Sequence, residues 1–174
     1  LQLVHQAAVV WLTRLAFLLL AEGRQVLPLT PAYRPYSLTV QALWAVRRMA
    51  QGLPLSDSLY TTPRYDLVRT LLHRVCRGDE ALGLPPFGRL FYDPAQWESH
   101  AILEHCRLSD RVVAVALDAL YRDVDYGEFS ARQLVAACAG LAWRKLSVVN
   151  EEISIQAEPQ PDFMHPLPDF VVSS

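Results

Sequence analysis

The sequence predicts a mainly α-helical fold: a helical bundle of about five or six helices with a possible short C-terminal β-hairpin. Apolar residues recur at helical spacing in several segments, most of which follow a serine or end near a glycine or proline. Of the 174 residues, 52% are hydrophobic and 20% are charged, a composition typical of folded domains. A chain of this length can bury a core without disulfides or metals.

The first helix is expected over residues 3–22, where apolar residues recur every three or four positions. Most of its other positions are also apolar, so we expect it to be central. The apolar run from Ala7 to Ala21 is 15 residues long and carries Arg14 at its centre. Since a membrane-spanning helix needs roughly 20 apolar residues, the run predicts a buried core helix and no membrane partner.

Two helices are expected next. After a proline-containing loop, Ser37 is expected to cap a helix that ends at about Ala50, with an apolar set facing the core: Leu38, Leu43, Trp44 and Met49. Helical spacing then predicts a helix over residues 65–77. Residues 79–97 combine prolines with large apolar side chains, and such a loop must pack against something because its apolar surface is too large to leave in water.

Ser109 is expected to cap a helix that ends at Tyr121, and Ser130 another that runs from 131 to about 144. Residues 146–156 alternate loosely between apolar and polar and are compatible with a β-hairpin that turns at Asn150 and Glu151. Four prolines and several acidic residues follow. The predicted organisation is a helical domain over 1–156 and a proline-rich tail or linker over 157–174.

Charge and cysteine content restrict the function. The formal net charge is -2, which excludes a strongly basic surface that wraps nucleic acid. Three cysteines, odd in number and widely spaced, favour free thiols in a reducing compartment, so we expect a cytoplasmic protein. The chain opens on Leu1 and not on methionine, which favours a segment of a longer protein.

No complete catalytic, cofactor-binding or metal-binding motif is present. Pro85 and Pro86 precede Phe87 as in the tetrapeptide of adenine methyltransferases, but Leu84 stands where a hydrogen-bond acceptor is needed. Lys145, the only lysine, has no preceding carboxylates at nuclease spacing. The sequence also lacks a nucleophile elbow, a P-loop and a dinucleotide-binding glycine motif. We therefore expect this segment itself to be non-catalytic.

Two basic pairs are the candidate contacts with DNA phosphates: Arg47 with Arg48, and Arg144 with Lys145. Arginine forms paired hydrogen bonds with phosphate oxygens. With a net charge of -2, any binding to double-stranded DNA is expected to be weak.

Three segments, in order, resemble a known family. The first runs Arg-Leu-Ala-Phe-Leu-Leu-Leu-Ala-Glu at 14–22, Val-Leu-Pro at 26–28 and Tyr-Arg-Pro-Tyr-Ser-Leu at 33–38; the family has "LLFLLYAE", "LLP" and "Y.PYSL". The second is Leu-Pro-Pro-Phe-Gly-Arg-Leu-Phe at 84–91 with Asp93, similar to "LPAYNGGLFD". The third is Leu-Ser-Asp at 108–110, which leads into a helix, and then Val-Asp-Tyr-Gly-Glu-Phe at 124–129 with Leu134, similar to "VDYRELDVEQLGSIYEGLLE".

These segments resemble the helical connector (spacer) of bacterial single-chain type IIG/IIL-like restriction-modification proteins. In this family a DNA adenine methyltransferase and an endonuclease share one chain. The chain departs from the pattern at 135–139, which reads Val-Ala-Ala-Cys-Ala in place of Gly-Ser-Ile-Tyr-Glu, and the "GSHYTP" that normally follows is missing after residue 156.

The resemblance implies a connector domain over 1–156 that orients nuclease and methyltransferase domains on DNA during phage defence. S-adenosylmethionine and magnesium are implied as cofactors of the parent, with none in this segment. Two alternatives remain open. One is a free-standing protein-interaction module that docks through the aromatic loop 87–97, with Phe91, Tyr92 and Trp97. The other is an enzyme of unrecognised type that uses a cluster of polar residues: His100, Glu104 and His105.

Overall fold

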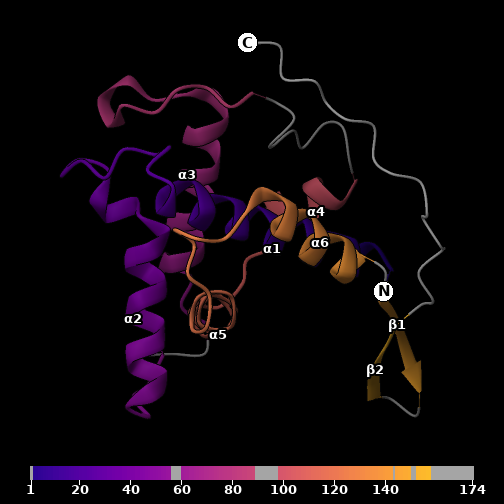
Figure 1. Ribbon diagram of the computed structural model, residues 1–174. Helices are drawn as coiled ribbons and strands as arrows, with labels where there is room; N and C mark the ends of the chain where they lie inside the picture. Colours follow the sequence, from indigo (N-terminus) through magenta and orange to yellow (C-terminus); the bar gives the residue numbers. More distant parts are fainter. Residues whose placement is uncertain (1, 56–59, 89–97, 143, 150–151, 158–174) are drawn as a thin grey trace.

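The computed structural model describes residues 2–55, 60–88, 98–142, 144–149 and 152–157, and it confirms the mainly α-helical fold (Figure 1). The described helices are α1 (Gln2–Gly23), α2 (Leu38–Ala50), α3 (Pro63–Arg77), α4 (Glu98–His105), α5 (Asp110–Tyr121) and α6 (Ala131–Ala142). Two short 3-10 helices, η1 (Arg34–Tyr36) and η2 (Glu80–Leu82), follow α1 and α3. Strands β1 (Arg144–Val149) and β2 (Glu152–Ala157) form an antiparallel hairpin.

Helix α1 lies at the centre of the bundle and contacts α2, α4, α5 and α6. Leu15, Leu18 and Leu19 have no exposed surface, and Trp11 is 4% exposed. The expectation of a central core helix is therefore confirmed. The helix spans 22 residues and is longer than the apolar run, because residues 2–6 before the run and Glu22 and Gly23 after it are also helical. By length and composition alone α1 would also suffice to cross a membrane, a property that it shares with core helices of folded proteins.

The face that α2 buries differs from the sequence prediction. Leu38 is buried as expected, but Ala42 and Ala45 fill the remaining core positions, while Leu43 is 38% exposed. Alanines let the neighbouring helix approach closely, since interhelical distance depends on the side chains at the contact. The partner is α5, which buries Ala114 and packs against α2.

The ends of the helices agree with the sequence in most cases. Ser37 accepts a hydrogen bond from the backbone N–H of Val40 at 3.3 Å, and Ser130 accepts one from Gln133 at 3.2 Å. Ser109 stands at the predicted N-cap of α5, but the prediction that its side chain caps the helix is wrong because it makes no capping hydrogen bond. Helix α4 was missed, because no helix was expected between residues 98 and 105.

The hairpin prediction is confirmed in the pairing of the backbone. Leu146 pairs with Ile155 and Val149 pairs with Glu152. The predicted turn residues, Asn150 and Glu151, lie outside the described residues, as does the tail from 158 onward. Helix α6 ends at Ala142, two residues before the predicted end, because Arg144 already opens β1.

Candidate functional site

The carboxylate of Glu22 joins the end of α1 to the start of α2. One oxygen, Oε1, accepts hydrogen bonds from the Tyr33 hydroxyl at 2.7 Å and from the backbone N–H of Leu38 at 2.7 Å. The other, Oε2, accepts from the Ser37 hydroxyl at 2.9 Å and from the backbone N–H of Thr39 at 2.8 Å. A buried negative charge at a helix N-terminus is stabilised by the unpaired N–H groups and by the helix dipole. We call this group the Glu22 junction.

The Glu22 junction is buried as a unit. Glu22 is 2% exposed, Ser37 is 1% exposed and Tyr33 has no exposed surface. Burial, together with the negative charge of Glu22, raises the pKa of the Tyr33 hydroxyl far above its ordinary value, so this hydroxyl stays a donor at every physiological pH. The junction is therefore structural, since its donors and acceptors are paired with one another.

Two further segments pack against the same half of α1. The ring of Phe87 meets that of Phe17 edge to face, with centroids 6.0 Å apart. Tyr126 lies against Gly23 so closely that a Cβ atom on this glycine would fall 2.8 Å from the Tyr126 Cβ. The Tyr126 hydroxyl donates to the carbonyl of Leu120 at 2.9 Å, which fixes the ring over the end of α5.

Tyr126 makes the stability of the fold depend on pH in the alkaline range. Burial, assisted by the nearby Cys138 and Tyr121, raises its pKa to about 12 from the ordinary 10. The folded state thus favours the neutral phenol, and the stability that this contributes is present below pH 10 and is lost as pH rises through about 12. We expect the free energy of unfolding, measured with urea, to fall across this interval. In Tyr126→Phe the fall should be smaller; an equal fall would contradict the assignment.

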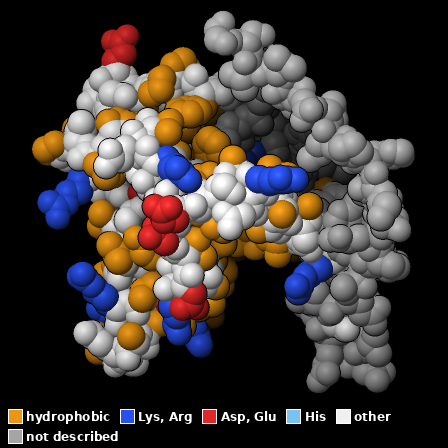
Figure 2. All heavy atoms as spheres, in the orientation of Figure 1, with side chains coloured by type: hydrophobic (Ala, Val, Ile, Leu, Met, Phe, Trp, Pro, Cys, Tyr) orange, Lys and Arg blue, Asp and Glu red, His pale blue; other side chains and the backbone are white. Residues whose placement is uncertain are grey.

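The four predicted phosphate contacts do not form one site. Figure 1 places α2, with Arg47 and Arg48, on the opposite side of the molecule from the hairpin, where Arg144 opens β1. Arg47 and Arg144 are exposed; Lys145 lies in β1, and its side chain is outside the described part. On the face in Figure 2 the cationic side chains are scattered among apolar and neutral surface, and some lie beside acidic side chains. This is not the continuous basic stripe of a strong nucleic-acid binder.

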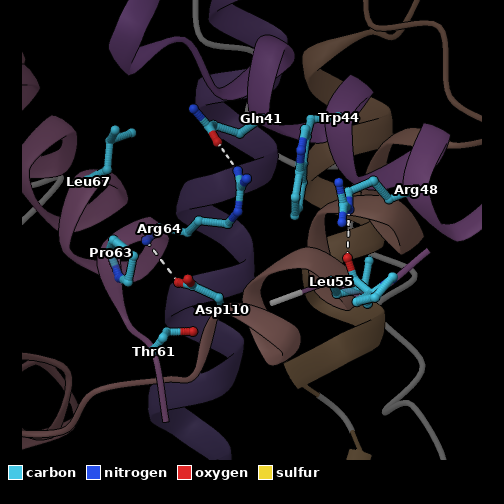
Figure 3. A pocket seen from close by; sticks show the side chains of 10 residues that line it. Gln41, Trp44, Arg48, Leu55, Thr61, Pro63, Arg64, Leu67 and Asp110 are labelled. Carbon is cyan, nitrogen blue, oxygen red and sulfur yellow. Dashed lines mark hydrogen bonds between the residues drawn. The ribbon is translucent and has the colours of Figure 1, made fainter. Parts of the chain in front are cut away.

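Arg48 lines a cleft between α2, α3 and α5, whereas Arg47 does not. The cleft has a volume of about 460 Å³ and is lined by Gln41, Trp44, Arg48, Pro54, Leu55, Thr61, Pro63, Arg64, Leu67 and Asp110. Figure 3 shows the indole of Trp44 between two guanidinium groups, those of Arg64 and Arg48. Their carbons lie 3.2 Å and 5.3 Å from the ring centroid, within the range of cation–π attraction. We call this group the Trp44 cleft.

Hydrogen bonds hold both arginines of the Trp44 cleft in place. Arg64 donates from Nη1 to the side-chain oxygen of Gln41, and Arg48 donates from Nε to the carbonyl of Pro54 at 2.6 Å. Asp110 accepts a hydrogen bond from the backbone N–H of Arg64 at 2.8 Å, which ties the start of α3 to the start of α5. Burial lowers the pKa of Arg64; Asp110 opposes this effect and Arg48 adds to it. Arg64 nevertheless stays charged, as guanidinium groups do in proteins.

Sequence reasoning identified Arg48 but missed Arg64 and Trp44 as parts of a site. A partial signal was present, because Gln41, Trp44 and Arg48 follow one another at intervals of three and four on one face of α2. Arg64 gave no such signal. It stands alone in sequence after Pro63 and joins the other residues only in the fold, where the start of α3 is tied to the start of α5 and α5 packs against α2.

The first part of the aromatic loop is structural. Phe87 is half-buried against Phe17, and its backbone N–H donates to the carbonyl of Val75 at 3.0 Å. The three residues that would decide for or against docking (Phe91, Tyr92 and Trp97) lie outside the described residues. The interaction-module alternative therefore stays untested.

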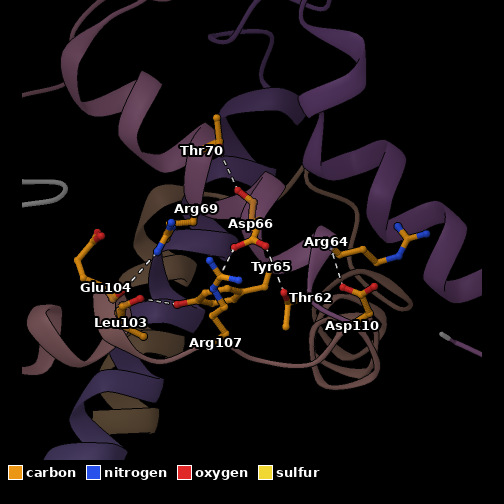
Figure 4. A network of polar contacts seen from close by, with 10 residues as sticks. All are labelled: Thr62, Arg64, Tyr65, Asp66, Arg69, Thr70, Leu103, Glu104, Arg107 and Asp110. Carbon is orange, nitrogen blue, oxygen red and sulfur yellow. Dashed lines mark hydrogen bonds and ion pairs between the residues drawn. The ribbon is translucent and has the colours of Figure 1, made fainter. Parts of the chain in front are cut away.

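The residues proposed for an unrecognised enzyme are not gathered into a metal site within the described part of the chain. Glu104 pairs with His73 of α3, with Oε1 3.0 Å from Nε2, and His105 is exposed. The side chain of His100 lies outside the described residues. In Figure 4, Tyr65 and Arg69 of α3 donate to the backbone carbonyls of α4, so Glu104 belongs to the contact that docks α4 on α3.

Comparison of the chain with protein-family models, with curated proteins and with solved structures finds no match.

Proposed function

We propose that this chain is the non-catalytic helical connector of a bacterial single-chain restriction-modification protein. In this role it holds the nuclease and the S-adenosylmethionine-dependent adenine methyltransferase at a fixed separation and orientation on DNA. Both cofactors, S-adenosylmethionine and magnesium, belong to the neighbouring domains of the parent. The parent acts on DNA in the cytoplasm.

One observation carries the proposal: the three segments on which the resemblance rests meet around the second half of α1. The first segment supplies the members of the Glu22 junction, namely Glu22, Tyr33, Ser37 and Leu38. Phe87 of the second packs on Phe17, and Tyr126 of the third packs on Gly23. Segments that are separated along the chain but form one packed unit are expected to be retained together.

The same unit suits a mechanical role. A connector transmits position only if its elements do not shift against one another, and close-packed interiors with satisfied buried polar groups resist such shifts. The Glu22 junction fixes the start of α2 relative to α1 through three hydrogen bonds, from Ser37, Leu38 and Thr39. Contacts with DNA would be few, made by side chains such as Arg47, Arg48, Arg144 and Lys145, and weak at physiological salt.

The sequence that flanks this segment in its gene tests the proposal most directly. We expect a cofactor-binding glycine motif and an Asn-Pro-Pro-Tyr tetrapeptide downstream. Finding neither on either side would overturn the proposal. A second test uses the purified chain with radiolabelled S-adenosylmethionine and duplex DNA. No methyl transfer above background is expected, and transfer that depends on the chain would contradict the non-catalytic role.

A further inference from the structure

We infer that the Trp44 cleft is a binding site for a phosphate group, which Arg48 and Arg64 hold from the two sides of the indole. The inference stands independently of the connector role, because it rests on the geometry of the cleft and not on the resemblance. It also separates Arg48 from Arg47, which lies beside it in sequence but does not line the cleft.

The first argument is the supply of hydrogen-bond donors. A guanidinium carries five N–H donors in a planar fork. Among the contacts of the described residues, Arg48 uses Nε for the Pro54 carbonyl and Arg64 uses Nη1 for the Gln41 oxygen. The other N–H donors of these two side chains make no hydrogen bond to the described residues. Phosphate oxygens match this fork and accept paired hydrogen bonds from it.

The second argument is charge. Three arginines of the described structure pair with carboxylates: Arg74 with Asp79 at 3.0 Å, Arg107 with Asp66 at 3.7 Å, and Arg122 with Asp118 at 2.6 Å. Neither Arg48 nor Arg64 forms a salt bridge within that part of the chain. The one carboxylate of the cleft, Asp110, accepts from the backbone N–H of Arg64. Figure 3 accordingly places it at the backbone end of Arg64, away from the guanidinium.

The third argument is preorganisation. Two like charges on either side of one ring repel each other, and Arg48 accordingly lowers the pKa of Arg64. A bound anion relieves this repulsion. The indole and the two protein acceptors already fix both guanidinium groups, so little side-chain freedom is lost on binding. The first turns of α3 and α5 also line the cleft, and helix N-termini favour negative charge.

A phosphate could come from a nucleic-acid strand or from a small phosphomonoester, and two probes distinguish these sources. The first is a fluorescein-labelled DNA duplex, followed by fluorescence anisotropy over a series of salt concentrations. The second is inorganic phosphate, followed through the NMR signal of the Trp44 indole N–H, with sodium chloride at equal ionic strength as the reference. Both use the full chain.

We expect Arg48→Gln and Arg64→Gln each to weaken binding of the responsive probe about tenfold. If that probe is duplex DNA, the slope of log affinity against log salt concentration should also become shallower by about one for each arginine removed. Arg64→Lys keeps the charge but loses the fork, and should fall between Arg64→Gln and the unmodified chain. Arg132→Gln is the matched control, because Arg132 is exposed on α6 and this substitution removes the same charge outside the cleft. It should change affinity less than about twofold.

Each outcome has a defined meaning once circular dichroism shows that the variants are folded. A response to DNA alone, or to both probes, that is lost in the two cleft variants supports a nucleic-acid phosphate, and a response to inorganic phosphate alone supports a small ligand. The inference is overturned if chloride moves the Trp44 signal as much as phosphate does. It also fails if neither probe binds, or if Arg132→Gln weakens binding as much as the cleft variants do. None of these results bears on the flanking-gene test of the connector.

Discussion

Replacing Glu22 with glutamine should lower the free energy of unfolding by about 3 kcal/mol, the largest effect that we expect from a single polar substitution in this chain. The carboxylate accepts four hydrogen bonds, two of them from backbone N–H groups in the first turn of α2. An amide of the same shape offers one acceptor oxygen and turns an NH₂ group toward groups that themselves donate. Urea denaturation followed by circular dichroism measures the change.

The substitution should loosen the start of α2 more than the rest of the core. In Glu22→Gln, amide hydrogen exchange should accelerate at Leu38 and Thr39, whose N–H groups lose the carboxylate, more than at Leu71 in the core of α3. Glu80→Gln is the matched control, because Glu80 is exposed in η2 and its loss should change stability by less than about 0.5 kcal/mol. If the two variants were equally stable, the Glu22 junction would not hold α2 to α1.

Elements that are determined by local interactions could be predicted from the sequence, whereas an element that depends on contacts with distant segments could not. Helices α1, α2, α3, α5 and α6 were expected close to their observed bounds because apolar spacing and caps such as Ser37 and Ser130 are local signals. Helix α4 was missed because its eight residues follow a proline-rich apolar stretch and carry only a weak apolar stripe. Its position depends on packing against α1 and on hydrogen bonds from Tyr65 and Arg69 of α3, which no local pattern reveals.

The candidate sites show the same limit. The segment with Glu22, Tyr33 and Ser37 could be recognised as a motif, but its meaning, a buried carboxylate that caps α2, required the fold. Trp44 was expected in the core because it is large and apolar, yet it is only half-buried, since alanines occupy the buried face of α2 and α3 brings Arg64 against the indole. Burial and contacts between distant segments decided both cases.

Gly23→Ala should destabilise the chain by about 2 kcal/mol, although alanine is the better helix former. The added Cβ would lie 2.8 Å from the Cβ of Tyr126 and 2.9 Å from its backbone carbonyl carbon. Neither atom can rotate away as the end of a flexible side chain could, so α1 and the segment around Tyr126 must separate. Overpacking of this kind typically costs about 1–3 kcal/mol. The higher helix propensity of alanine contributes at most about 1 kcal/mol, so the net effect is destabilising.

Gly140→Ala provides the contrast, because a Cβ at this position in α6 meets nothing within 4 Å. The substitution should leave stability unchanged or raise it by up to about 1 kcal/mol through helix propensity alone. Urea midpoints of the two variants, measured side by side, therefore separate the steric effect at Gly23 from the backbone effect common to both. If Gly23→Ala were as stable as Gly140→Ala, the segment around Tyr126 would not pack on the end of α1. The convergence of the three segments, on which the connector proposal rests, would then fail with it.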